Sequence, residues 1–177
     1  MRTTASSDSE PSGWRCRQLG ATDAPSYRTV FLEALEAHPA AFAASAEDES
    51  VLAVEDFAKR LSGKESMVFG VLAGDDLAAV ATFVPQSLRK RRHVAMIWGM
   101  YVRPQFEGTG MGKALMRHVL QFAENQVDQV ELYVNVTNER ARGLYVRLGF
   151  ERYGVMRRAL RVDGTDHDAD MLVKVFR

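Results

Sequence analysis

The 177-residue sequence predicts one mixed α/β domain, with its elements in the order β-α-α-β-β-β-α-β-α-β-β. The first observation is that strand-like stretches of alternating or continuous apolar residues are interspersed with stretches that have the spacing of amphipathic helices. The second is that a chain of this length is sufficient for one domain with its own core. The third is that no internal repeat, low-complexity core or linker divides the chain.

The first third of the chain is expected to hold one strand and two helices. Alternating bulky and charged residues indicate the strand, and regularly spaced apolar residues indicate each helix. Thr22 or Asp23 can cap the first helix, and Pro39 ends it. The expected bounds are a strand at 14–19, a helix from 22 or 23 to about 38 and a helix at about 54–61, with a small and acidic segment at 40–50.

Three strands are expected in the middle of the chain. A turn at Gly74-Asp75-Asp76 separates the first two, which is typical of a hairpin. The third run is apolar on both faces, as expected of a strand that helices cover on each side. The expected bounds are 66–72, 77–84 and 94–102.

The last third is expected to form two helices and three strands. Asn138 is a typical cap for the second helix, and Gly149 suits the left-handed position that follows a helix. The expected bounds are a helix at 112–126, a strand at 130–136, a helix from 138 to before 149, and closing strands near 150–162 and 168–176 joined by Asp163-Gly164.

Composition and charge exclude several classes of function. Lys plus Arg and Asp plus Glu number 23 each, so no net charge draws the chain to nucleic acid or to an anionic membrane. No run of about 18 apolar residues is present, so no membrane span is expected. With Cys16 alone, no internal disulfide can form, and a cytoplasmic location is expected. Residues 1–13 are expected to be a disordered tail, and 14–177 the single domain.

The segment Arg103–Lys113 suggests an anion site. It follows a predicted strand, contains Gly108, Gly110 and Gly112, and leads directly into a helix. Such a unit aims free backbone N–H groups and the positive end of the helix at one point, which suits phosphate. Glycines let the backbone approach the anion closely.

Two common phosphate loops do not fit this segment. A P-loop needs a glycine five residues before Gly112 and Ser or Thr after Lys113, but Glu107 and Ala114 stand there. A dinucleotide fingerprint needs its third glycine one residue later than Gly112. ATP and NAD are therefore excluded as ligands of this loop.

Two blocks of the chain, in this order, resemble the GNAT acetyltransferase superfamily. The first is Glu107–Gly112, which is similar to the pattern (Arg/Gln)-x-x-Gly-x-(Gly/Ala), with Val102-x-Pro104 before it. The second is Asn138-x-x-Ala141-x-x-x-Tyr145-x-x-x-Gly149-Phe150. The resemblance implies a three-layer αβα sandwich around a mixed, mostly antiparallel sheet. It also implies direct acetyl transfer from acetyl-CoA, without a metal, to a primary amine in a ternary complex.

The resemblance also implies which residues hold the cofactor. The pantetheine arm would lie along the strand at 94–102, where it separates from the next strand. Gly99 in this strand suits a bulge or a close backbone approach, and the alternative is that it only relieves crowding under a helix. Tyr145 would be the general acid that protonates the departing thiolate, and it would also contact the cofactor. The other implied cofactor contacts are Met100, Tyr101, Val102, Glu107, Gly108, Thr109, Gly110, Met111, Gly112, Lys113 and Asn138.

The chain departs from the family pattern at one position. The family usually has Arg or Gln where Glu107 stands, so we expect backbone N–H groups to hold the pyrophosphate and the Glu107 carboxylate to face solvent. A carboxylate that pointed inward would repel the phosphates.

The sequence leaves the acceptor and the general base open. The strand at 94–102 contains no carboxylate, and the candidate bases are Glu33, Glu36, His38, Glu47 and Glu49, with a water-relayed base or a neutral amine as alternatives. The residues predicted to contact the acceptor are Phe31, Glu33, Glu47 and Trp98. The acceptor is expected to be a small-molecule or peptide amine, and the chain is expected to form a homodimer. A non-catalytic acyl-CoA sensor and an interaction domain are the alternative functions.

Overall fold

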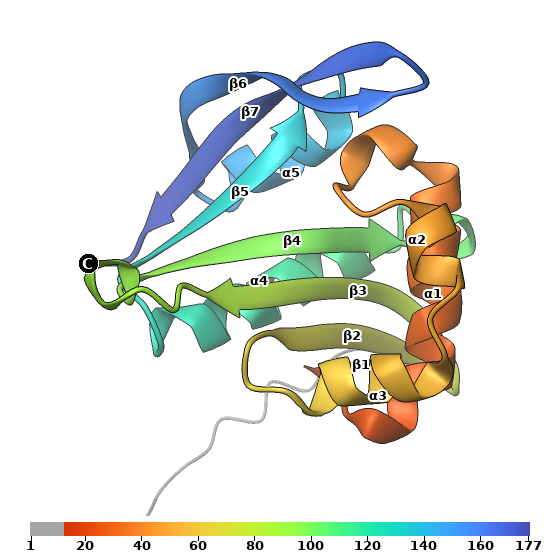
Figure 1. Cartoon of the computed structure of the whole chain (residues 1–177). Coiled ribbons are helices and arrows are strands. Elements are labelled where there is room, and N and C mark those ends of the chain that lie inside the picture. The colour runs from red at the N-terminus through yellow and green to blue at the C-terminus, as the bar shows by residue number, and fades with distance from the viewer. Residues whose placement is uncertain (1–12) are drawn as a thin grey trace, which may run out of the picture.

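A computed structural model describes residues 13–177, so the predicted tail lies, apart from Gly13, outside the described residues. Seven strands form one sheet in the order β1-β2-β3-β4-β5-β7-β6 (Figure 1). Neighbouring strands are antiparallel except β4 and β5, which are parallel. The strands are β1 (Trp14–Gln18), β2 (Met67–Ala73), β3 (Asp76–Pro85), β4 (Val94–Val102), β5 (Gln129–Asn135), β6 (Glu151–Val162) and β7 (Thr165–Val175).

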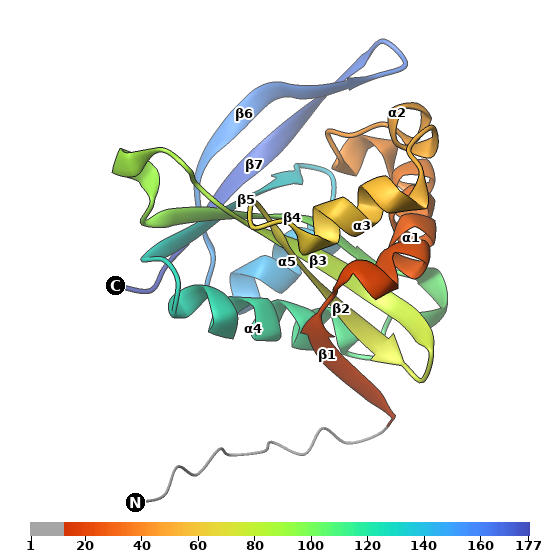
Figure 2. The same cartoon turned by 60° about the horizontal axis from the view of Figure 1, so that its bottom comes forward.

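Helices cover both faces of this sheet. Figure 2 shows α4 and α5 on one side of it and α1 and α3 on the other. The predicted three-layer αβα sandwich is therefore confirmed. The helices are α1 (Ala24–Ala37), α2 (Ala46–Ser50), α3 (Val54–Ser62), α4 (Met111–Glu124) and α5 (Glu139–Arg147), with 3₁₀ turns η1 (Ala21–Asp23), η2 (Pro39–Ala41), η3 (Arg89–Arg91) and η4 (Pro104–Phe106).

Each helical layer buries its own core against the sheet. On the α4 side, Leu115 and Val119 are fully buried, as the apolar spacing of that helix predicts. On the α1 side, Tyr27, Phe31 and Phe57 form an aromatic cluster with ring centroids 5.6 to 6.4 Å apart. Burial of this apolar surface is the main force that holds the three layers together.

Helix α2 was not predicted. Its segment is rich in small and acidic residues and has no apolar period that would indicate a helix. Local and tertiary contacts hold it instead. The Ser45 hydroxyl accepts a hydrogen bond from the Asp48 N–H at 3.1 Å, and Glu49 pairs with Arg60 of α3 at 2.9 Å.

The cap signals of α5 are confirmed. Asn138 Oδ1 accepts a hydrogen bond from the Ala141 N–H at 3.1 Å. At the other end Gly149 has a φ of 86°, and the N–H groups of Gly149 and Phe150 donate to the carbonyls of Val146 and Tyr145. This is the Schellman arrangement, in which a left-handed glycine satisfies the last carbonyls of a helix. The predicted side-chain cap of α1 is wrong: Asp23 stands at the N-cap position, but its carboxylate accepts hydrogen bonds from Arg17 and the Gly20 N–H and from no N–H of α1.

None of the helices within residues 13–177 combines the length and the apolar character that crossing a bilayer would require.

Candidate functional site

The sheet opens into a wedge between β4 and β5. Their parallel pairing covers only residues 94–96 of β4 and 129–131 of β5. Beyond these residues the two strands diverge, as Figure 1 shows. The predicted separation of these strands is confirmed, and it leaves one edge of β4 without a strand partner.

A bulge at Gly99 shapes the open edge of β4. Gly99 has a φ of 66°, and the register of β3 against β4 shifts between Val80 and Thr82. The predicted bulge is thus confirmed. A Cβ on Gly99 would meet only the Thr82 hydroxyl oxygen, at 3.5 Å, so the positive φ and not crowding calls for glycine.

The wedge also changes the expected burial of β4. The strand was expected to be covered by helices on both faces, but the Trp98 side chain is 40% exposed. The covering is interrupted because Trp98 lies beyond the last residue that pairs with β5, where the wedge replaces packed sheet.

Alternation along β4 decides which main-chain groups face the wedge. The Arg103 N–H donates to the Ala78 carbonyl of β3 at 2.9 Å. Because peptide groups alternate in direction along a strand, the main-chain groups of Tyr101 also point to β3. Those of Met100 and Val102 point to the open side. Of the predicted main-chain contacts, those of Met100 and Val102 are therefore free for a ligand, and that of Tyr101 is not.

The glycine-rich turn before α4 presents several backbone N–H groups at the start of a helix. Gly108 and Gly110 have φ values of 76° and 89°, and a Cβ on either would meet no atom within 4 Å. The Thr109 hydroxyl donates to the Phe106 carbonyl at 2.6 Å and fixes the turn. Within residues 13–177, the N–H groups without a hydrogen-bond partner include those of Gly108, Thr109, Gly110, Gly112 and Lys113. These N–H groups and the positive end of α4 can bind a pyrophosphate.

The third glycine of the turn has a packing role. A Cβ on Gly112 would lie 3.0 Å from Val102 Cγ2 and 3.2 Å from Met100 Cε. Glycine therefore lets α4 begin directly against β4. Met100 also lines a cavity inside the wedge, so the turn is adjacent to this cavity.

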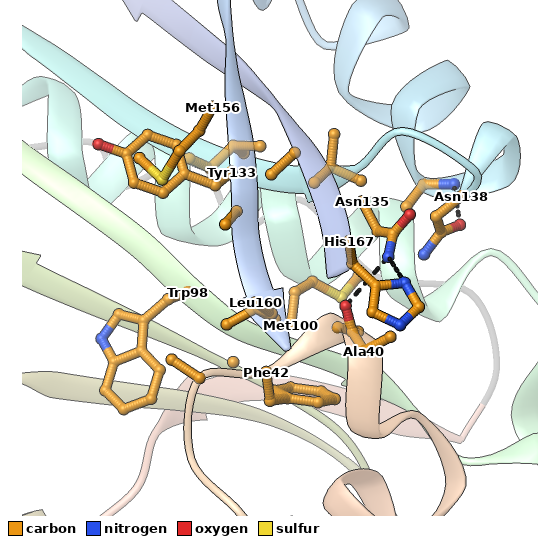
Figure 3. Close-up of a pocket in the computed structure, with 18 of the residues that line it drawn as sticks. Ala40, Phe42, Trp98, Met100, Tyr133, Asn135, Asn138, Met156, Leu160 and His167 are labelled. Atoms are coloured by element: carbon orange, nitrogen blue, oxygen red, sulfur yellow. Dashed lines mark hydrogen bonds between the residues drawn. The ribbon is translucent and has the colours of Figure 1, made fainter. Parts of the chain in front are cut away.

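The wedge contains a cavity of about 540 Å³ (Figure 3). Its walls come from β4, β5, α5, the segment around η2 and the β6–β7 hairpin. The walls are mostly apolar, which favours a ligand with apolar groups. The large apolar side chains that line it are Phe42, Met96, Ile97, Trp98, Met100, Leu132, Val134, Met156 and Leu160.

A wide bulge in β6 forms part of this wall. The register of β6 against β7 shifts between Met156 and Leu160. Asp168 of β7 holds the bulge, because its carboxylate accepts hydrogen bonds from the Arg158 N–H at 2.8 Å and from the Arg157 side chain at 2.6 Å. Both bonds lower the pKa of Asp168, and the bond from the main-chain N–H of Arg158 has the larger effect. Asp168 therefore stabilises the bulge, although it also lines the cavity.

Tyr145 brings a hydroxyl group to the cavity. The residue is 8% exposed, its ring packs edge-on against Phe150, and it lines the cavity. Its hydroxyl has no hydrogen bond with any residue among 13–177. Burial raises the pKa of Tyr145 to about 12. The phenol is therefore protonated at neutral pH and is able to donate a hydrogen bond.

Glu107 has a partner that was not predicted. Its carboxylate forms an ion pair with Arg140 in the first turn of α5. The carboxylate was expected only to face solvent, but the fold places a cation from 33 residues further along the chain beside it. This pair joins the glycine-rich turn to α5 and compensates the negative charge next to the N–H groups.

The predicted acceptor residues are not brought together. Trp98 lines the cavity, whereas Phe31, Glu33 and Glu47 do not. Phe31 is 2% exposed within the aromatic core cluster. Glu33 accepts hydrogen bonds from the Tyr101 hydroxyl and the Arg103 side chain, each at 3.0 Å, and Glu47 is exposed in α2.

Sequence reasoning missed Asn135 and His167, two polar residues of the cavity wall. Asn135 ends β5, directly before the second block that Asn138 begins, and a polar residue at such a strand end is a usable signal. No local signal marks His167. It reaches the cavity only because β7 pairs with β5 from another part of the chain.

No group of three or more His, Cys, Asp or Glu side chains in the described part of the chain is arranged to hold a metal ion.

The sequence pattern of the acetyltransferase (GNAT) family matches residues 25–150, which is more than half of the chain. The chain belongs to this family. Its turn before α4, its wedge and its α5 cap thus have the arrangement that the two sequence blocks predicted. The family uses acetyl-CoA as acetyl donor.

Relatives and solved structures agree with this assignment. The chain is 43% identical over 65 residues to N-alpha-acetyltransferase RimI of Mycobacterium tuberculosis, which covers 37% of this chain and 40% of that protein. An acetyltransferase of the GNAT family from Streptococcus pneumoniae superposes with a TM-score of 0.82 at 17% identity, over 93% of this chain and 99% of that one. The yncA protein of Salmonella typhimurium, solved with its cofactor acetyl-CoA, superposes with a TM-score of 0.76 at 17% identity, over 94% of this chain and 95% of that one. The structures show a shared fold.

Proposed function

We propose that this chain is an N-acetyltransferase that moves the acetyl group of acetyl-CoA to a primary amine of a small molecule or peptide by direct transfer in a ternary complex. One juxtaposition carries the proposal. The unpaired N–H groups of the glycine-rich turn stand at one end of a split sheet, and the free Tyr145 hydroxyl lines the cavity inside the split. Membership of the family supports it, and so does the similarity to RimI, which is named an N-alpha-acetyltransferase.

The residues present fit acetyl-CoA. The N–H groups of Gly108, Thr109, Gly110, Gly112 and Lys113 can donate to the pyrophosphate oxygens, and open space surrounds Gly108 and Gly110. The main-chain groups of Met100 and Val102 can pair with the amides of the pantetheine arm, as a neighbouring strand would. Asn138 and Tyr145 complete the wall towards α5. Tyr101 supports this site from behind, because its main chain pairs with β3 and its hydroxyl with Glu33.

Tyr145 is the residue that we assign to the chemical step. Acetyl-CoA supplies an activated thioester, so the protein has to orient the amine and stabilise the leaving sulfur. The Tyr145 hydroxyl donates its hydrogen to the thiolate as negative charge develops there. No side chain is assigned as general base, since Asp168, the carboxylate of the described cavity wall, is bound to Arg157 and the main chain of Arg158.

Two measurements test the proposed function. Isothermal titration with acetyl-CoA should show binding, which an interaction domain with an empty cavity would not. A thiol-release assay over a panel of amines, amino acids and peptides should show turnover, which a non-catalytic acyl-CoA sensor would not. Absence of binding, or binding without release of coenzyme A for any amine of the panel, would contradict the proposal.

The Glu107–Arg140 pair gives a prediction about affinity. Glu107→Gln should leave the Kd for acetyl-CoA unchanged or lower it up to about threefold, because Arg140 is then free for the phosphates. Arg140→Gln should raise the Kd about three- to tenfold, because Glu107 is left uncompensated beside the anion site. Titration calorimetry at low and high salt measures both.

The double variant is the control for that prediction. Glu107→Gln with Arg140→Gln should have a Kd close to that of the wild-type protein, since the carboxylate and the cation that compensates it are removed together. A marked loss of affinity in Glu107→Gln would show that the carboxylate itself helps to hold the turn.

A cytoplasmic location and a homodimer stay predictions from the sequence.

A further inference from the structure

The side-chain amide of Asn135 has one determined orientation. Its Oδ1 accepts hydrogen bonds from the N–H and the hydroxyl of Thr137, at 3.0 and 2.8 Å. Its Nδ2 therefore faces the Ala40 carbonyl oxygen at 3.2 Å and His167 Nδ1 at 3.5 Å. The opposite orientation would set Nδ2 against the Thr137 N–H and the Asn135 Oδ1 against the Ala40 carbonyl oxygen. The two hydrogens of Nδ2 point to Ala40 and His167.

This orientation fixes the tautomer of His167. An amide nitrogen only donates hydrogen bonds, so Nδ1 of His167 has to accept and carries the lone pair. The proton of the neutral ring is then on Nε2. A proton on Nδ1 would face an N–H hydrogen of Asn135. Figure 3 shows this chain of contacts from Ala40 through Asn135 to His167.

The Nε2–H group is an isolated donor in an apolar wall. Nε2 has no hydrogen bond with any residue that the structure describes. Phe42 and Leu160 line the same cavity, and the one carboxylate of the described wall, Asp168, is held by Arg157 and Arg158. A ligand oxygen that accepted the Nε2 hydrogen would satisfy this donor in low-dielectric surroundings, where a hydrogen bond is strong.

His167 lies on the η2 side of the cavity, because Asn135 joins it to the Ala40 carbonyl oxygen. Ala40 belongs to η2, which directly follows α1, whereas the glycine-rich turn begins α4 on the opposite face of the sheet. His167 and Phe42 line the cavity near η2. Met100, which also lines it, lies against Gly112 in the first turn of α4.

We propose that His167 determines acceptor specificity by donating its Nε2–H to a carbonyl or carboxylate oxygen next to the reacting amine. The acceptor class is therefore a primary amine with an α-carbonyl oxygen and an apolar side chain, as in a free amino acid or the first residue of a peptide. This inference rests on the proposed function. It makes His167 a donor that orients the acceptor and not the base that deprotonates it.

Matched acceptors and variants test the proposal. Phenylalaninamide has the carbonyl oxygen, and phenethylamine lacks it. The wild-type protein should favour phenylalaninamide by about tenfold or more in kcat/KM. His167→Leu should lower kcat/KM for phenylalaninamide about 10- to 100-fold, mainly through KM, leave phenethylamine within about threefold and leave the KM for acetyl-CoA unchanged. Phenylalanine and the dipeptide Phe-Ala then distinguish a free amino acid from a peptide.

His167→Gln separates the donor role from a base. Glutamine places an amide N–H near the position of Nε2 but takes up no proton near neutral pH. It should keep kcat/KM for phenylalaninamide within about fivefold of wild type. An equal loss in His167→Gln and His167→Leu, or an equal loss for phenethylamine, would overturn the proposal.

Nitrogen NMR of the imidazole gives a readout that does not depend on activity. In the wild-type protein the neutral ring of His167 should show a proton on Nε2 and a lone pair on Nδ1. In Asn135→Leu the ring should become a mixture of tautomers. A wild-type ring with its proton on Nδ1 would refute the inference even if the protein binds acetyl-CoA. Failure to bind acetyl-CoA or to acetylate any amine would instead count against the proposed function.

Discussion

Replacing Tyr145 by phenylalanine should lower kcat about 10- to 100-fold and change the KM for acetyl-CoA by less than about threefold. The loss corresponds to about 1.4–2.7 kcal/mol of transition-state stabilisation. It stays below the full range of general acid catalysis because a thiol is a good leaving group, with a pKa of about 8.5 for a cysteine side chain. Steady-state kinetics with acetyl-CoA and a competent amine measures both parameters.

The raised pKa of Tyr145 predicts the pH range in which its hydroxyl can donate a proton. Burial raises the pKa to about 12, so the hydroxyl stays protonated below that pH and loses its hydrogen only as the pH rises towards 12. A fall in kcat that begins near pH 8 or 9 must therefore come from another group. Stability should change little in Tyr145→Phe, because the hydroxyl makes no hydrogen bond with the described residues.

Tyr153→Phe is the matched control. Tyr153 also has a pKa raised to about 12, by burial first and then by nearby Glu131, but it is 49% exposed on β6 and does not line the cavity. Its replacement should leave kcat within about twofold. If Tyr145→Phe also leaves kcat unchanged, Tyr145 is a packing residue and the acid is elsewhere.

Replacing Gly110 by alanine should raise the Kd for acetyl-CoA by about tenfold or more. Gly110 caps α4 with a φ of 89° and a ψ of −8°, a conformation that costs an L-residue about 1–2 kcal/mol. No atom lies within 4 Å of the added Cβ, so the strain is in the backbone itself. Relief of that strain turns the adjacent peptide groups, and the N–H groups of the turn no longer point at one anion. Titration calorimetry measures the effect.

Gly74→Ala separates this loss from a general loss of stability. Gly74 has a φ of 62° in the β2–β3 turn, and its Cβ position is also open. Both variants should lower the free energy of unfolding by about 1–2 kcal/mol, but Gly74→Ala should bind acetyl-CoA like the wild type. Equal affinities in the two variants would mean that the turn before α4 does not hold the pyrophosphate.

The sequence alone was sufficient for the features that local spacing encodes. The glycine-rich turn, the bulge at Gly99, the Asn138 cap and the left-handed Gly149 each depend on the backbone preferences of a few adjacent residues. Their residue types therefore predict them without knowledge of the fold. The apolar periods of α4 and β4 are local in the same way.

The tertiary structure decided which distant side chains meet. Asn135, Ala40 and His167 come from three segments, and only the β5–β7 pairing and the position of η2 bring them together. Burial likewise assigned Phe31 to the core, although its residue type suits a binding wall equally well.

The glycine-rich turn shows both kinds of information in one site. Its glycines predict an anion site from the sequence alone, because the positive φ values that such a turn needs are a preference of single residues. The effect of Glu107 on that site is decided by Arg140, because charge compensation depends on distance in space and not on spacing in the chain.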